Sequence, residues 1–377
     1  MTIGAIFSFS LPIYIEMKYG YSQWHFFIRY IIFAGIGIFI MITLAQLNPN
    51  RIFNPLGWFL FLVSLITIIV MPKLPSTICP TIKGARRWIS LWIVNISPLE
   101  FLKIGIIFFF SWSFSRKLIP KHFPTFKDEF FAIIPYLILL AFVAFFVVIF
   151  QSDLGETLLI LSVFTIMLLF TKVSSKVFLF LISAGGLLLI IGLMQKEYRW
   201  ERVKSSLYTL YLMMPDFIQN WFSISNKDID ISYQLKQSMQ AIYNGGFTGV
   251  GIGNGEIKMG FLSDVHTDFV LAGIAEETGV WGVIMVVSLV VTLVWRIFRV
   301  ANRIETKTQR DYNYQLFCVG IGVLIFLETL LNMLGIVGLL PLKGLPIPFV
   351  SYGGSSIIAF SIAIGMVLMI SKKADLN

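Results

Sequence analysis

The sequence predicts an all-α polytopic membrane protein of about ten transmembrane helices, with both termini in the cytoplasm and one large loop outside. Composition is the first observation: hydrophobic residues make up 57% of the 377 residues and charged residues 13%, whereas a soluble domain carries about 25% charged residues. The second is that apolar stretches recur along the whole chain, and most of them are close in length to the roughly 20 residues that a helix needs to cross a bilayer core.

The predicted spans follow one another from end to end. The first is short for a complete crossing. The sixth follows the fifth almost directly, which predicts a tight hairpin around Gln151-Ser152-Asp153. The expected spans are 1–16, 26–47, 56–72, 98–115, 130–150, 154–170, 177–194, 268–298, 314–340 and 350–370.

The distribution of basic residues predicts the orientation. With both termini inside, the inner loops and tail carry 14 Lys and Arg residues and the short outer loops carry 6. Cytoplasmic loops are the ones enriched in Lys and Arg, whereas long loops cross regardless of charge. We therefore expect both termini inside and the long loop 196–267, between helices 7 and 8, outside. The whole chain 1–377 then forms a single membrane domain that contains this loop.

The net charge of +9 does not predict a nucleic-acid partner, because the basic residues are scattered between apolar segments. Anionic lipid head groups and orientation signals explain them better. Cys79 and Cys318 are expected to be free thiols. Three histidines and two cysteines in different segments exclude a structural zinc site of the usual spacing.

Asp268 is the strongest catalytic candidate, in the segment 264–269 at the outer mouth of the eighth span. Polar residues that are costly to place in a membrane are functional candidates, and a carboxylate here could serve as a general base. We expect Asp268 in the first turn of a helix, on one face with Ala272 and Glu276. The alternative is an ordinary helix start, with Thr267 as N-cap and the helix dipole favouring an acidic residue.

A cationic segment precedes the fourth span. Lys83, Arg86 and Arg87 stand in an outer loop, against the positive-inside trend, and so predict binding of an anion such as a pyrophosphate. Contact with lipid head groups is the alternative. Glu100 and Lys103, one turn apart on the fourth span, could simply neutralise each other.

Three further segments are candidates for structure or function. The hairpin containing Asp153 could be a capped turn. The glycine-dense segment 245–255 lacks the surrounding βαβ unit of a dinucleotide site and instead suggests a flexible or closely approached backbone. The segment 341–349 has three prolines and predicts a rigid non-helical link, which membranes tolerate only against protein or a watery cavity.

Together and in order, these segments resemble the SEDS family (shape, elongation, division and sporulation) of membrane glycosyltransferases. The resemblance covers almost the whole chain. It is carried by Gly84-Ala85-Arg86-Arg87-Trp88-Ile89, Pro98 with Glu100 and Lys103, Gln151 to Gly155, Tyr198-Arg199 with Arg202, Tyr233-Gln234 to Gly245-Gly246, His266-Thr267-Asp268-Phe269 with Glu276-Glu277, and Ser351-Tyr352-Gly353-Gly354-Ser355-Ser356.

Two features are similar to the division branch rather than the elongation branch: Gly253-Asn254-Gly255 with Lys258, and Lys343 before Gly344. Four features depart from the family pattern. Three are segments: Ser97-Pro98-Leu99-Glu100 in place of Gln-Pro-Ser-Glu, Gln151-Ser152-Asp153 in place of Gln-Pro-Asp, and Leu262-Ser263-Asp264-Val265-His266-Thr267-Asp268 in place of LPEAHTD, which keeps the acidic residue before the helix as Asp. The fourth is Gly260, where division-branch relatives often carry an acidic residue.

The resemblance implies polymerisation of lipid II at the outer leaflet, with inversion at the donor sugar and release of undecaprenyl pyrophosphate. It implies that Asp268 is the base. Arg86, Arg87, Lys103 and Lys343 become candidates for binding the pyrophosphate. The supporting residues of the same motifs are Glu100, Asp153, His266, Thr267, Glu276, Glu277 and Ser351.

The resemblance also implies partners and a location. The substrates would be lipid II and the undecaprenyl-linked glycan strand, and the partners a class B penicillin-binding protein transpeptidase and other divisome proteins. The location would be the bacterial plasma (inner) membrane at the division septum. The sequence identifies no cofactor site, although a divalent cation (Mg²⁺ or Mn²⁺) could help the pyrophosphate to leave.

Three other functions stay open from the sequence. One is polymerisation by a member of the elongation branch. Another is transport, because broken helices and charges near the membrane also suit a lipid II flippase, although transporters place their site at the midplane. A structural scaffold is the last, and it predicts that Asp268 tolerates replacement.

Overall fold

A computed structural model describes residues 1–82, 84–91, 94–120, 125–171, 173–194, 197–214, 232–262, 264–341 and 344–374. They form two compact units, which we treat separately. The first unit comprises Met1–Ile31, Leu189–Val291 and Leu327–Gly353. The second unit comprises Ile32–Leu188, Thr292–Phe326 and Gly354–Asn377.

The chain is a multi-pass membrane protein, as predicted. Within the described residues, seven helices are long and apolar enough to cross a bilayer. Two more apolar helices are α7 (Leu154–Leu169) and α8 (Ser175–Met194). The seven are α3 (His25–Gln46), α4 (Pro49–Val70, continued by the 3₁₀ turn η1, Met71–Lys73), α5 (Pro98–Lys117), α6 (Phe126–Phe150), α12 (Val270–Asn302), α13 (Gln309–Ile336) and α14 (Gly354–Ser371).

The first predicted span, 1–16, is instead two short helices. α1 covers Thr2–Ser10 and α2 covers Ile13–Tyr19, with a break at Leu11 and Pro12. Proline has no amide hydrogen to donate to a helical carbonyl, and the chain breaks at Pro12, although α4 and α6 continue past Pro55 and Pro135. Neither helix has the length to cross a bilayer by itself.

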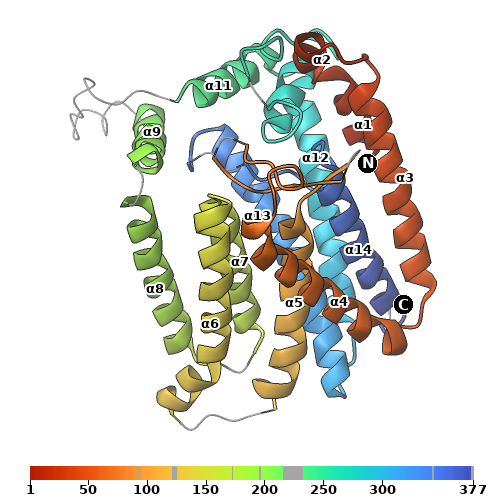
Figure 1. The fold of residues 1–377 in the computed structure, drawn as a ribbon, viewed down its shortest axis with the longest axis vertical. Helices are drawn as coiled ribbons and strands as arrows, with labels where there is room; N and C mark the ends of the chain where they lie inside the picture. Colours follow the sequence, from red (N-terminus) through yellow and green to blue (C-terminus); the bar gives the residue numbers. More distant parts are fainter. Residues whose placement is uncertain are drawn as a thin grey trace. The chain divides into compact units, whose positions relative to one another are not determined.

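Helix α5 is the core of the second unit. Of an apolar stretch of 18 residues in α5, 83% are buried, whereas 28% of the corresponding stretch in α6 are buried. α4 makes its main contact with α5, and α14 and α7 pack on α5 as well (Figure 1). A small antiparallel hairpin, which the sequence does not predict, precedes α5, with β1 (Ile89–Leu91) paired to β2 (Val94–Ile96). The hairpin positions the chain directly before the buried N-terminus of α5.

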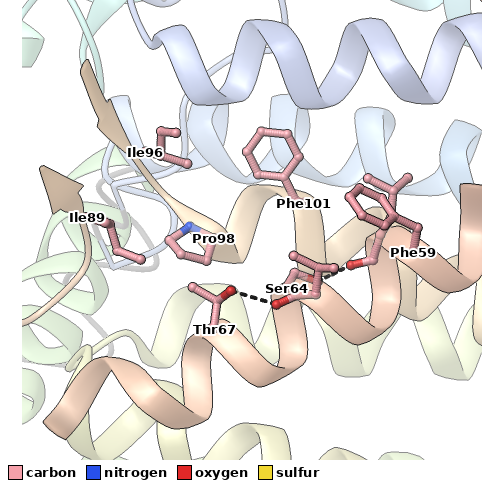
Figure 2. Close-up of a pocket in the computed structure, with 9 residues that line it drawn as sticks. Phe59, Ser64, Thr67, Ile89, Ile96, Pro98 and Phe101 are labelled. Carbon is pink, nitrogen blue, oxygen red and sulfur yellow. Dashed lines mark hydrogen bonds between the residues drawn. The ribbon is translucent and has the colours of Figure 1, made fainter. Parts of the chain in front are cut away.

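An apolar hollow of about 250 Å³ lies where this hairpin meets α4 and α5. Phe59, Val63 and Thr67 line it from α4, and Pro98 and Phe101 from the start of α5 (Figure 2). Ile89 and Ile96, which are partners across the hairpin, close its end. The sequence does not predict this hollow.

The predicted outer loop contains two helices in the first unit. α9 covers Glu197–Met213 and α11 covers Tyr233–Gly245. The amide of Ser232 donates to the Ser205 hydroxyl at 3.1 Å, and the hydroxyl of Ser238 donates to the carbonyl of Ile336 at 2.9 Å. α11 is thereby attached both to α9 and to the end of α13.

Candidate active site

The turn 264–269 carries Asp268 immediately before α12. Asp264 has a φ of 57°, and its carbonyl accepts the amides of Thr267 and Asp268, each at 3.1 Å. The Thr267 hydroxyl also donates to that carbonyl at 3.1 Å. The residues expected to start the helix belong to this turn instead. α12 therefore begins at Val270, two residues later than predicted. Thr267 therefore closes the turn and does not cap α12 as the alternative supposed.

Polar contacts from two other segments hold this turn in place. The side-chain amide of Asn332, on α13, donates to the carbonyls of Asp268 (2.8 Å) and Leu345 (2.7 Å). The hydroxyl of Ser351 donates to the carbonyl of Thr267 at 2.7 Å. Asn332 and Ser351 are each 2% exposed, so the turn is attached to the proline-rich link 344–352 through buried hydrogen bonds.

The carboxylate of Asp268 faces the backbone of Gly344. A β-carbon at Gly344 would lie 2.7 Å from Oδ2 of Asp268. A side chain at this position would therefore require the carboxyl group of Asp268 to shift. Asp268 itself is half-buried.

His266 is enclosed by aromatic rings. Its ring centroid lies 5.1 Å from that of Phe26 and 5.8 Å from that of Tyr352, and its carbonyl accepts the amide of Tyr352 at 2.9 Å. Burial lowers the pKa of His266 to about 4, with a smaller opposing effect of Asp264. His266 is therefore a neutral packing residue of the turn at neutral pH.

The glycine-dense segment pairs with a break in α12. Gly279 interrupts the helix with φ 68° and ψ −166°. The carbonyl of Glu276 accepts the amide of Val250 at 3.0 Å, and the amide of Val280 donates to the carbonyl of Gly246 at 3.0 Å. These bonds replace the intrahelical ones that the break removes. A β-carbon at Gly249 would lie 2.3 Å from the carbonyl oxygen of Glu277, which confirms the predicted close approach of backbones.

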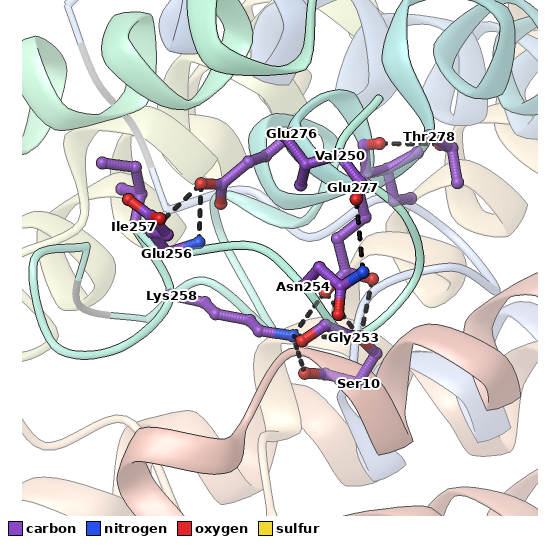
Figure 3. Close-up of polar contacts among 11 residues, drawn as sticks. Ser10, Val250, Gly253, Asn254, Glu256, Ile257, Lys258, Glu276, Glu277 and Thr278 are labelled. Atoms are coloured by element: carbon purple, nitrogen blue, oxygen red, sulfur yellow. Dashed lines mark hydrogen bonds and ion pairs between the residues drawn. The ribbon is translucent and has the colours of Figure 1, made fainter. Parts of the chain in front are cut away.

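Glu276 and Glu277, each 1% exposed, bind α12 to the residues that come just after the glycine-dense segment. Oε1 of Glu276 accepts the amides of Glu256 (2.9 Å) and Ile257 (3.0 Å). Glu277 and Lys258 form a buried ion pair of 2.6 Å (Figure 3).

Lys258 connects this ion pair to the N-terminus of the chain. Its ammonium also donates to the carbonyls of Ser10 (2.9 Å) and Gly253 (2.8 Å). The hydroxyl of Ser10 donates to the carboxylate of Glu277 at 2.6 Å. α1, the glycine-dense segment and the N-terminal part of α12 are thus joined at one buried cluster.

In the second unit, Arg86 and Arg87 contact the ends of neighbouring helices. Nη1 of Arg86 donates to the carbonyls of Pro72 (2.8 Å) and Leu74 (3.1 Å), beside η1. Nε of Arg87 donates to the carbonyl of Gln151, at the end of α6, at 2.8 Å. These bonds satisfy carbonyls that have no partner within their helix.

Asp153 completes this contact. Its Oδ2 lies 3.4 Å from Nη1 of Arg87. Its Oδ1 accepts the amide of Glu156 at 3.1 Å and so caps α7. The hairpin at 151–153 is therefore the capped turn that the sequence left as one alternative, and the side chain of Arg87 remains 35% exposed.

Lys103 is enclosed between two carboxylates. It is 1% exposed, and its ammonium lies 3.0 Å from Oε2 of Glu100 and 3.2 Å from Oε1 of Glu156. Glu100 and Lys103 thus form an ion pair, which agrees with the alternative that they neutralise each other. Glu156, which directly follows the Gln151 to Gly155 motif, is the third member.

Two predicted cations, Lys83 and Lys343, lie outside the described residues. In the part of the chain that the structure covers, no group of three or more His, Cys, Asp or Glu side chains could hold a metal ion.

The comparisons with known proteins bear on the whole chain. The family model described as FtsW, RodA and SpoVE, cell cycle protein, matches residues 1–376. The chain belongs to this family. The predicted resemblance is thereby confirmed, and it extends over the membrane helices as well as over the motifs.

Curated relatives in this family share one name. A protein of Helicobacter pylori (strain ATCC 700392 / 26695) named "Probable peptidoglycan glycosyltransferase FtsW" is 40% identical over 98% of this chain and 95% of its own length. Another with that name, from Nitrosomonas europaea, is 33% identical over 100% of this chain and 92% of its own.

Two solved structures share the fold. One, reported as structural coordination of polymerization and crosslinking by a peptidoglycan synthase complex, matches with a TM-score of 0.71 and 23% identity, over 100% of this chain and 96% of that one. The rod shape determining protein RodA of Thermus thermophilus matches with a TM-score of 0.62 and 20% identity, over 100% and 94% of the two chains.

Asn332 is the positioning residue that sequence reasoning missed. An asparagine within the apolar span 314–340 is costly in a membrane and was a usable signal. Its target, the carbonyl of Asp268, lies 64 residues earlier in the chain, so no local pattern connects the two.

Proposed function

We propose that this protein is a peptidoglycan glycosyltransferase that polymerises lipid II into glycan strands at the outer leaflet, during septal wall synthesis. Support comes from membership of the family and from the names of the curated relatives. The observation that carries the site assignment is the half-buried carboxylate of Asp268, in a turn held by Asn332 and Ser351.

In the proposed reaction, Asp268 accepts a proton from the 4-hydroxyl of the acceptor sugar. The oxygen then attacks C1 of the donor sugar, a new C1–O bond forms, and the bond from C1 to the pyrophosphate breaks. Undecaprenyl pyrophosphate carries the electron pair away. A single displacement inverts the configuration at C1, so the mechanism needs no covalent intermediate with the enzyme. General-base assistance contributes about 10²–10⁴ in rate to such steps.

The departing pyrophosphate needs positive charge. We propose Arg86 and Arg87 for this role, together with Lys343. Arg87 already pairs with Asp153, and the pyrophosphate would compete with that carboxylate. Lys103 has two buried carboxylate partners, so we assign it to the stability of the α5–α7 contact.

The family resemblance further suggests where and with what the enzyme works. We place it in the plasma (inner) membrane at the division septum. Its partners there would be a class B penicillin-binding protein transpeptidase and other divisome proteins. The name FtsW among the curated relatives supports the division role over elongation.

The test of this function is polymerisation by the purified full-length chain. Labelled lipid II in detergent or liposomes is incubated with the protein, and glycan polymers are resolved on a gel. The proposal predicts polymers that lysozyme digests. A protein that moves lipid II across liposome membranes and makes no polymer, alone or with its transpeptidase partner, would instead be a flippase.

A further inference from the structure

A polar hollow of about 650 Å³ lies in the second unit, where several membrane helices begin or end. Its lining brings together three cations: Arg116 near the end of α5, Arg310 at the start of α13, and Lys373 just after α14. The rest of the lining is Asn50, Thr308, Gln309 and Asp311. None of these residues has a role in the proposed reaction.

The one carboxylate that lines the hollow, that of Asp311, caps the start of α13. Oδ2 of Asp311 accepts the amide of Thr308 at 2.8 Å and its hydroxyl at 2.7 Å. The hydroxyl of Thr308 in turn lies 3.3 Å from the amide of Asp311, which makes a reciprocal cap. Within the described residues, no ion pair joins Arg116, Arg310 or Lys373 to a carboxylate.

The walls of the hollow are fixed by contacts that do not involve these charges. Ile304 and Ala374 form an antiparallel bridge, which ties the segment before α13 to the C-terminal tail. The hydroxyl of Tyr314 bonds to Oδ1 of Asn50 at 3.1 Å, between α13 and α4.

Arg116 is held in place by its own helix. Its guanidinium carbon lies 4.3 Å from the centre of the Trp112 ring, and Nη1 donates to the Trp112 carbonyl at 3.2 Å. A stacked guanidinium loses less freedom on binding a ligand than a mobile one does.

We propose that this hollow binds the phosphate group of an anionic phospholipid. Guanidinium groups bind phosphate oxygens in pairs, and the N-terminus of α13 adds a favourable dipole for an anion. A phosphate would also relieve repulsion among the three cations. The hollow lies at the ends of membrane helices, which is the depth of lipid head groups, and at the end rich in basic residues, which the positive-inside rule assigns to the cytoplasm.

The experiment measures binding to the purified full-length chain in neutral detergent by titration calorimetry. The ligands are dihexanoyl phosphatidylglycerol, dihexanoyl phosphatidylcholine and inorganic phosphate. The triple variant Arg116→Gln, Arg310→Gln, Lys373→Gln removes the cations of the hollow. The matched control Lys117→Gln, Lys307→Gln, Lys372→Gln removes the same charge from exposed positions on the same segments that do not line the hollow.

The proposal predicts that phosphatidylglycerol binds the unaltered protein and that phosphatidylcholine binds at least several-fold more weakly. The triple variant should bind phosphatidylglycerol about tenfold or more weakly, because each cation near a lipid head group contributes about fivefold. The control triple should change the affinity by less than about threefold.

Three results would overturn the proposal: no binding of phosphatidylglycerol, equal weakening in both triple variants, or inorganic phosphate binding as tightly as the lipid. Equal weakening in both triple variants would mean that the lipid is attracted only by surface charge. Inorganic phosphate binding as tightly as the lipid would mean that the hollow is a site for a soluble anion. If the triple variant fails to fold, Lys373→Gln alone, at an exposed position after α14, should still weaken lipid binding about fivefold.

Discussion

The side-chain amide of Asn332 donates a 2.8 Å hydrogen bond to the backbone carbonyl of Asp268. The same amide reaches the carbonyl of Leu345 at 2.7 Å. One buried side chain on α13 therefore fixes both the turn that carries the proposed base and the link that passes beside it. Asn332 is a positioning residue, since it acts on Asp268 through the backbone and not on the substrate.

Replacing Asn332 with Ala should lower polymerisation by about tenfold or more, because a misplaced catalytic group is costly in rate. Leaving two buried carbonyls without a donor costs about 1–3 kcal/mol for each unsatisfied group. The measurement is of kcat and KM for lipid II separately. A positioning role predicts a lower kcat with nearly constant KM, whereas a loss of folded protein lowers the active fraction alone.

Asn313 provides the matched control on the same helix. It is also buried, at 1% exposure, and bonds to Asn54 at 3.3 Å. Asn313→Ala should reduce thermal stability and leave kcat per folded molecule unchanged. Equal losses of kcat in both variants would contradict a positioning role for Asn332.

The buried ion pair of Lys258 and Glu277 should couple strongly in a double-mutant cycle. Removing one partner, as in Lys258→Met, leaves an uncompensated charge and should cost about 3–5 kcal/mol of stability. The double variant Lys258→Met, Glu277→Gln removes both charges and should recover much of that loss. Thermal unfolding of the purified protein in detergent gives the midpoints for the cycle.

The exposed pair of Lys307 and Glu305 is the control for that cycle, with 77% and 70% of the side chains exposed. Lys307→Met should leave the midpoint nearly unchanged, because exposed ion pairs contribute little. Additive effects of Lys258→Met and Glu277→Gln would show that the buried pair does not act as a unit.

Several of the membrane helices were predicted closely from the sequence, because apolar length is a local property. The sixth and seventh spans, expected at 154–170 and 177–194, are α7 (Leu154–Leu169) and α8 (Ser175–Met194). The predicted helices were wrong where a single residue interrupts an apolar stretch. Pro12 divides the first predicted span, and Gly279 breaks α12 only because the glycine-dense segment supplies the missing hydrogen bonds.

Gly344→Ala should impair the proposed base directly. The added methyl group would lie 2.7 Å from Oδ2 of Asp268, which is closer than ordinary contact, so the carboxylate must move. A displacement near 1 Å can cost about 10²-fold in rate. Polymerisation should therefore fall strongly while the unfolding midpoint changes little. Gly35→Ala is the control, because a β-carbon there meets nothing within 4 Å.

His266 should make stability depend on pH. The ordinary pKa of histidine is near 6.5, and burial lowers that of His266 to about 4 in the folded protein. Between these values the unfolded chain binds more protons, so stability is complete above pH 6.5 and decreases as the pH falls toward 4, by up to roughly 3 kcal/mol. His266→Phe should flatten this part of the profile. An unchanged slope between pH 6.5 and 4 in the variant would assign the effect to other groups.

The candidate site was only partly accessible to sequence reasoning. Motifs identified Asp268, Ser351 and the two glutamates of α12, because each belongs to an ordered set along the chain. The role of Lys103 could not be read from residue type. A cation on a membrane helix suggests an anion, but the structure adds the carboxylate of Glu156, which is distant in the sequence.

The most direct test of the catalytic assignment is the rate of lipid II polymerisation by purified Asp268→Asn. Asp264→Asn is the matched control, because it removes a carboxylate from the same turn and asparagine tolerates a φ of 57°. The account predicts that Asp268→Asn loses about 10²–10⁴ in rate with an unchanged unfolding midpoint, while Asp264→Asn keeps most of its activity. Polymerisation by Asp268→Asn at the wild-type rate would contradict it.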